Sequence, residues 1–107
     1  MAGALLALSH ILSGSPHGYV PDGWHAPRPW LAQALCIHAH EGAWNDDTGN
    51  GYYGGMQFLL ATWAGVGGIT RPDRASPREQ LYRAWLVWNR DGDSWREWGT
   101  ASICGLS

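Results

Sequence analysis

The sequence predicts a small α+β domain that is mostly helical, with a short β-hairpin beside a candidate catalytic groove. Three observations predict this fold class. Apolar residues recur at helical spacing over residues 29–41. A capping box at residues 76–79 opens a second helical stretch. Residues 45–58, between the two, contain too many glycines for a helix. A chain of 107 residues can form one domain with one hydrophobic core.

Residues 1–28 are predicted to precede the main domain, which spans residues 29–107. We interpret residues 1–12 as a short amphipathic helix. Their apolar run hints at a signal peptide, but it lacks a positively charged start and a small-residue cleavage motif. A remnant of a longer precursor is the alternative. The prolines and glycines that follow indicate a linker.

The first helix of the main domain is predicted over residues 29–41. Pro29 suits the first turn of a helix, and Gly42 suits its end. One face of this helix carries Trp30, Ala34, Ile37, His38 and Glu41. Glu41 is therefore expected in the last turn, near the inward side of the helix.

The glycine-rich residues 45–58 are predicted to form a short hairpin or an irregular sheet. Asn50-Gly51 is a strong turn signal, and Tyr52-Tyr53 suits a strand. We expect this segment to return Gln57 towards Glu41.

Three further segments complete the predicted domain. Residues 59–64 suit a short helix that carries Thr62 and Trp63. Residues 77–90 suit a longer helix, followed by a turn at residues 91–93. One side of the longer helix is expected in the core; it carries Leu81, Ala84, Trp85 and Trp88. Residues 95–103 then form a closing segment that returns Cys104 towards Cys36.

Composition excludes several classes of function. No run of eighteen apolar residues occurs, so we expect no membrane span. The chain has no lysine, its seven arginines are scattered and its net charge is -2, which argues against a nucleic-acid partner. Its eight tryptophans suit either a compact core or flat platforms for sugar rings.

The two cysteines, Cys36 and Cys104, suit a single bridge in a small secreted domain or two free thiols in the cytosol. They lack the spacing of a metal site. His38 and Glu41 share a helix face, but the arrangement of a zinc protease is absent. We therefore expect neither a metal nor a cofactor.

Glu41 is the candidate catalytic residue. The C-terminus of a helix carries partial negative charge, which disfavours an ionised carboxylate. A carboxylic acid that keeps its proton near neutral pH is what a general acid needs. An acid beside a groove of aromatic rings and backbone amides is typical of enzymes that cut glycosidic bonds.

A second acid is less well defined. Asp46 and Asp47 are the nearest carboxylates that follow Glu41, and Asp47 is the candidate, although turn formation also explains both. In the single-acid alternative, Glu41 protonates the glycosidic oxygen and then acts as a base. The acetamido group or the 6-hydroxyl of the substrate would then serve as the nucleophile.

Six residues are candidates for binding sugar. Trp44, Tyr52 and Trp63 are candidate platforms for sugar rings. The side chains of Asn50, Gln57 and Thr62 can form hydrogen bonds with N-acetyl or hydroxyl groups.

These residues together resemble the catalytic domain of resuscitation-promoting factors and related actinobacterial transglycosylase-like domains. The resemblance covers roughly residues 30–104. It is carried by Glu41-Gly42-Ala43-Trp44, by the long string at residues 48–58, by Thr62-Trp63 and by the tryptophan-rich stretch that ends in Cys104. The chain differs from the family pattern between Cys36 and Glu41, where residues 37–40 intervene.

The resemblance implies a small lysozyme-like fold and cleavage of peptidoglycan between N-acetylmuramic acid and N-acetylglucosamine. It implies that Glu41 is the essential acid, that Gln57, Thr62 and the groove aromatics contact sugar, and that Cys36 and Cys104 form a disulfide. It also implies action outside the cytoplasm, as a secreted or cell-wall-associated protein or as part of a phage virion.

We therefore predict a monomeric peptidoglycan-cleaving glycosidase, of lytic-transglycosylase or lysozyme type. The main alternative is a non-catalytic peptidoglycan-binding module of a phage tail or a cell-wall protein on the same scaffold. A third interpretation is a structural domain in which all the tryptophans belong to the core.

Overall fold

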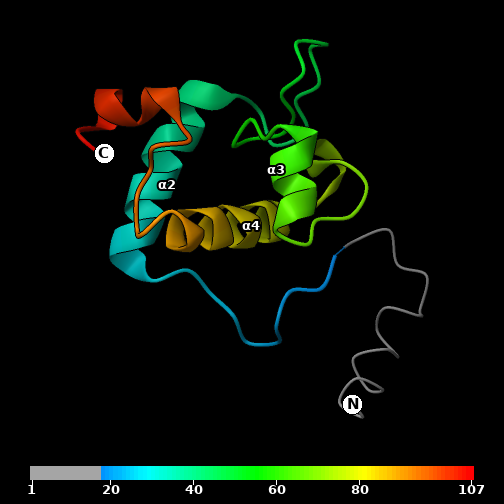
Figure 1. The fold of residues 1–107 in the computed structure, drawn as a ribbon, viewed down its shortest axis with the longest axis horizontal. Helices are drawn as coiled ribbons and strands as arrows, with labels where there is room; N and C mark the ends of the chain where they lie inside the picture. Colours follow the sequence, from blue (N-terminus) through cyan, green and yellow to red (C-terminus); the bar gives the residue numbers. More distant parts are fainter. Residues whose placement is uncertain (1–17) are drawn as a thin grey trace.

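The computed structural model describes residues 18–107, and these residues form a mostly helical domain (Figure 1). Figure 1 shows α2 near one end of α4 and α3 near the other. The elements are α2 (Arg28–Glu41), α3 (Leu60–Gly65), the 3₁₀ helix η1 (Pro72–Arg74), α4 (Pro77–Arg90) and the 3₁₀ helix η2 (Gly99–Cys104). The predicted N-terminal helix lies outside the described residues, and the division at residue 28 stays a prediction. Among the described residues, no helix is both long and apolar enough to cross a membrane.

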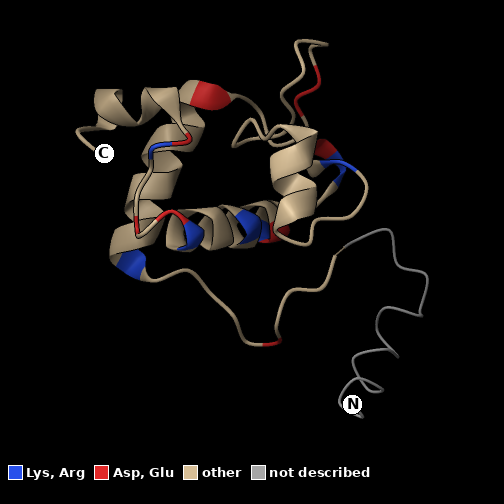
Figure 2. Cartoon of the chain, viewed as in Figure 1, with Lys and Arg blue, Asp and Glu red and all other residues tan. Residues whose placement is uncertain are grey.

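Helix α2 confirms the prediction for residues 29–41 almost to the residue. Its first turn contains Pro29, and its last residue is Glu41. Trp30, Ala34 and Ile37 are buried, as their spacing predicts. The only acidic residue of α2 therefore lies at its C-terminal end, opposite the basic residue at its start (Figure 2).

Helix α4 begins and ends where the capping box and the turn signal place it. The Ser76 hydroxyl accepts a hydrogen bond from the backbone N–H of Glu79 at 3.0 Å. The Glu79 carboxylate is buried beside the guanidinium of Arg83, at 3.4 Å. It also accepts a hydrogen bond from the backbone N–H of Gly18 at 3.0 Å. This buried pair fixes the segment that precedes α2 against α4.

The core is largely aromatic. The Trp30 ring stacks on Trp95 at 5.3 Å between centroids and meets Trp85 edge to face at 5.4 Å. Ala84 of α4 is fully buried in the same core. Leu81, Trp85 and Trp88 are partly buried against the core, which confirms the predicted apolar side of α4.

The predicted hairpin is not formed as two paired strands. The chain makes two isolated antiparallel bridges, Asp47 with Tyr53 and Tyr53 with Phe58. Tyr53 and Phe58 exchange backbone hydrogen bonds at 2.9 and 3.0 Å. Positive φ angles at Gly49, Gly51 and Gly54 turn the chain too often for a regular strand to extend. The segment is closer to the irregular alternative than to a ladder.

The closing segment returns the chain to α2. A disulfide joins Cys36 of α2 to Cys104 of η2, with their Cα atoms 6.1 Å apart. This bond holds η2 against the C-terminal half of α2, so residues of η2 lie close to Glu41.

Candidate active site

Glu41 lies at one end of a groove. Its Oε2 atom accepts a hydrogen bond of 2.5 Å from the hydroxyl of Thr100, which belongs to η2. The carboxyl group is half-buried and forms part of the wall of a cavity of about 350 Å³. The other residues of this wall are Asn50, Tyr52, Gln57, Glu97, Trp98, Gly99 and Thr100.

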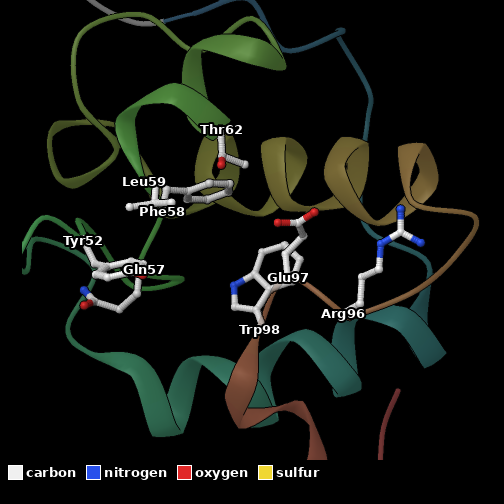
Figure 3. A pocket seen from close by; sticks show the side chains of 8 residues that line it. All are labelled: Tyr52, Gln57, Phe58, Leu59, Thr62, Arg96, Glu97 and Trp98. Carbon is white, nitrogen blue, oxygen red and sulfur yellow. The ribbon is translucent and has the colours of Figure 1, made fainter.

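A second cavity, of about 280 Å³, continues this groove. It is lined by Phe58, Leu59, Thr62 and Arg96 and by four residues that also line the first cavity: Tyr52, Gln57, Glu97 and Trp98. Figure 3 shows Tyr52 and Gln57 on one side, Arg96 at the opposite side, and Glu97 and Trp98 between them. Five of the predicted site residues therefore line one continuous groove: Glu41, Asn50, Tyr52, Gln57 and Thr62.

Gln57 is held rigidly within this groove. It has a positive φ of 50°, which is uncommon outside glycine. Its Nε2 donates hydrogen bonds to Asp46 Oδ2 at 2.8 Å and to the carbonyl of Gly54 at 2.9 Å. Its Oε1 accepts no hydrogen bond from the described residues. This oxygen is therefore available to a hydroxyl or N–H group of a ligand.

Two of the predicted platforms lie outside the groove. Trp63 is 1% exposed, packs edge to face on Phe58 at 5.2 Å and donates its indole N–H to the Ile69 carbonyl. It is a core residue, and its ring has no free face for a sugar. Trp44 stacks on the His38 imidazole at 3.8 Å, and His38 in turn bonds to the Gly55 carbonyl at 2.8 Å. Trp44 and His38 therefore support the backbone at Gly55, and Trp44 lines neither cavity.

Asp47 lies outside the groove that contains Glu41. Its carboxylate pairs with the Arg71 guanidinium at 2.9 Å, and Arg71 also pairs with Asp73 at 2.8 Å. Asp47 lines neither cavity of the groove. Its position supports the turn-forming explanation, because the residue anchors one end of an isolated bridge.

We therefore expect Asp47→Asn to keep the cell-wall cleavage that the resemblance implies, at a rate within about threefold of that of the parent. The variant loses only an exposed ion pair, which contributes little to stability. Turbidity loss of purified cell walls measures the rate. A decrease of a hundredfold or more in a folded variant would restore Asp47 as a second acid.

Seven residues that line the groove were not predicted from the sequence: Phe58, Leu59, Arg96, Glu97, Trp98, Gly99 and Thr100. Trp98 forms part of the groove wall, and its indole N–H donates to the Met56 carbonyl at 2.8 Å. Glu97 brings a second carboxyl group to the groove. Its pKa is raised, first by a hydrogen bond with the Asp91 carboxyl and then by burial.

One cluster of potential metal ligands occurs among the described residues. Cys36, His40 and Cys104 place one ligand atom each within 4.8 Å of the others. The two sulfur atoms are bonded to each other, so neither offers a thiolate. The cluster is a disulfide with a neighbouring imidazole, and it lies outside the groove.

Comparison with known proteins identifies the family. Residues 24–101 match the family described as a transglycosylase-like domain. The chain is 45% identical over 78 residues to resuscitation-promoting factor RpfC of Mycobacterium tuberculosis, covering 71% of this chain and 54% of that protein. It is 43% identical over 75 residues to resuscitation-promoting factor Rpf of Micrococcus luteus, covering 70% of this chain and 30% of that protein.

A longer match links the chain to resuscitation-promoting factor Rpf1 of Corynebacterium glutamicum, at 38% identity over 102 residues, or 91% of this chain and 51% of that protein. The chain thus spans about half or less of the length of these relatives. The family match includes Glu41 and every other residue that lines the groove, and it ends before Cys104. The chain belongs to the transglycosylase-like domain family and carries a domain of the resuscitation-promoting-factor type.

Proposed function

We propose that this chain is a peptidoglycan-cleaving glycosidase, of lytic-transglycosylase or lysozyme type, that uses Glu41 as its single general acid and base. The observation that carries the proposal is the position of Glu41. Its carboxyl forms part of the wall of a groove that is also lined by two aromatic residues, Tyr52 and Trp98, and by polar side chains that can form hydrogen bonds. Family membership supports a bond of the glycan strand as the target.

Thr100 suits a role in orienting the acid. Its hydroxyl holds Glu41 Oε2, whereas Oε1 makes no hydrogen bond with the described residues. A proton on Oε1 can therefore be directed to the glycosidic oxygen. As this proton is transferred, the bond between C1 and the leaving oxygen breaks, and Glu41 becomes a carboxylate.

The second half of the reaction returns a proton to Glu41. If water attacks C1, the carboxylate removes its proton and a hydrolysed end results. If the acetamido oxygen attacks C1 first, a cyclic oxazolinium forms; water then attacks C1, the bond between C1 and the acetamido oxygen breaks, and the carboxylate removes the proton of that water to give the same hydrolysed end. If the 6-hydroxyl of the same sugar attacks, the carboxylate removes its proton and a 1,6-anhydro end results. Either route needs one protein carboxyl group, in contrast to the paired carboxylates of most glycosidases.

The proposed sugar contacts are Asn50, Tyr52, Gln57 and Thr62. Tyr52 is 44% exposed, which leaves one face of its ring available for stacking. The Asn50 side chain already fixes the local turn, because its Oδ1 accepts from the backbone N–H of Tyr52 at 3.0 Å. Gln57 and Thr62 then provide polar atoms along the groove.

We propose that the protein acts outside the cytoplasm, at the cell wall, as a monomer that needs neither metal nor cofactor. A disulfide suits an oxidising compartment. The relatives described above are bacterial proteins, which supports a bacterial rather than a phage setting.

Product analysis tests the proposal directly. Purified peptidoglycan incubated with the protein is expected to release soluble muropeptides, and mass spectrometry identifies their ends as reducing or 1,6-anhydro N-acetylmuramic acid. A parallel sedimentation assay measures binding. Binding without any released fragment would favour the non-catalytic module instead.

A further inference from the structure

The groove end that lies away from Tyr52 and Gln57 is the charged end. Arg96 lines it and is the only cationic residue that lines either cavity in the described part of the chain. Its side chain is 65% exposed, and its Nη2 bonds to Asp91 Oδ1 at 3.3 Å. Its Nε and Nη1 make no hydrogen bond with the described residues. The guanidinium is therefore anchored on one side and open on the other.

Asp91 provides this anchor from the C-terminus of α4. It is 7% exposed, and its Oδ1 also pairs with Arg90 at 3.5 Å. Its Oδ2 is buried and receives no hydrogen bond from an N–H or O–H group in the described residues. A proton held between Asp91 and the neighbouring Glu97 would satisfy this oxygen, because two adjacent carboxyl groups favour a shared proton over two negative charges.

Glu97 is the partner for that proton. The hydrogen bond with Asp91, burial and the negative charge of Asp91 raise its pKa, while Arg90 and Arg96 act in the opposite direction. Arg90 lies 3.8 Å from Glu97 Oε2. The Glu97 side chain is 39% exposed, so it reaches the groove as well as Asp91. Protonation of Glu97 removes a negative charge beside the guanidinium groups of Arg90 and Arg96, which then face the single carboxylate of Asp91.

We propose that the Arg96 guanidinium, with Glu97 beside it, forms a subsite that binds a carboxylate of the glycan strand. This subsite rests on the proposed function and makes its substrate class specific. A guanidinium fixed on one edge and open on the other suits a carboxylate. N-acetylmuramyl units supply carboxylates, on the lactyl group or on the stem peptide, whereas polymers of N-acetylglucosamine supply none.

Binding measurements in the Glu41→Gln background separate this subsite from catalysis. Three probes are compared by calorimetry: chitohexaose, glycan strands stripped of stem peptides, and strands that retain them. Adding Arg96→Gln is expected to weaken binding of the carboxylated strands about tenfold, with chitohexaose unchanged. Weakening only for stripped strands assigns the lactyl carboxylate, and weakening only for peptide-bearing strands assigns the stem peptide.

Two further variants control for charge and folding. Arg28→Gln removes the same charge from the exposed start of α2, outside the groove, and is expected to bind all probes like the background. Arg96→Lys keeps the charge but loses the planar fork, and intermediate affinity is expected. The subsite would be overturned if Arg96→Gln weakened binding of all three probes equally, or of none of them. A loss of affinity in Arg28→Gln equal to that in Arg96→Gln would also overturn it.

The pH dependence tests the role of Glu97. Above about pH 5 the substrate carboxylates stay ionised, Glu41 is absent in the background variant, and Arg90 and Arg96 stay charged. Affinity for carboxylated strands is therefore expected to fall as pH rises through the pKa of Glu97, because an ionised Glu97 repels the ligand. Glu97→Gln mimics the neutral acid and should bind independently of pH. A pH dependence that persists in Glu97→Gln would overturn this role.

Failure of the proposed function would show separately, as turnover that survives in Glu41→Gln alone.

Discussion

Replacement of Glu41 by glutamine is expected to lower kcat on peptidoglycan by about a thousandfold while leaving the fold intact. The amide has nearly the same shape as the carboxylic acid, and its oxygen can still accept the hydrogen bond from Thr100. It has no proton to give to the glycosidic oxygen, and it cannot serve as a base in the second step. Turbidity loss of purified cell walls and release of muropeptides measure the change.

The control for Glu41→Gln is Asp22→Asn, which removes an exposed carboxylate outside the groove. It should clear walls at the parent rate. Thermal unfolding of all variants checks that the fold is retained. If Glu41→Gln clears walls as fast as the parent, the acid is misassigned. If Glu97→Gln lost activity and Glu41→Gln kept it, Glu97 would be the general acid in place of Glu41.

The sequence was sufficient for the parts of this fold that depend on local signals. The burial of Trp30 and Ile37 follows from their helical spacing, and Ser76 marks the start of α4 by satisfying a free backbone N–H. These signals act within a few residues. They placed Glu41 at the end of α2, which is the feature on which the candidate site depends.

It could not be predicted from the sequence which tryptophans lie only in the core and which line the groove. Trp63 lies against the backbone of Gly68, so closely that a Cβ there would lie 2.3 Å from the indole, and this contact takes the ring into the core. Trp98, from the other end of the chain, also belongs to the core but has an edge that lines the groove. An indole is equally suited to both places, so only the tertiary packing distinguishes them.

Glu97 was missed for a related reason. In the sequence it is an ordinary acidic residue in a polar segment, and nothing nearby marks it. Its position depends on contacts distant along the chain, including the bond between the Trp98 indole and the Met56 carbonyl, 42 residues away. Its environment depends on the buried Asp91. A constellation assembled by such long-range contacts leaves no periodic or motif signal.

The second large effect is expected from Gln80→Met, which should lower the free energy of unfolding by about 3–5 kcal/mol. Gln80 is fully buried in α4. Its Oε1 accepts from the Gly55 N–H at 2.8 Å, and its Nε2 donates to the carbonyls of Trp44 at 2.9 Å and Ala75 at 3.0 Å. Methionine has a similar volume but leaves three backbone groups without this partner, the buried N–H of Gly55 and two partly buried carbonyls, and a buried group left unpaired costs about 1–3 kcal/mol.

The same change should weaken substrate binding, because Gln80 is the link between α4 and the segment that carries Asn50 and Tyr52 into the groove. Urea unfolding measures the stability, and KM on peptidoglycan at a temperature where the variant stays folded measures the groove. Gln33→Met is the matched control: it removes one bond, from the Trp95 indole at 2.7 Å, and should cost about 1 kcal/mol with KM unchanged. If the two variants lost the same free energy of unfolding, the Gln80 amide would not be what holds the segment with Asn50 and Tyr52 in place. An unchanged KM in Gln80→Met would mean that the groove keeps its shape without this link.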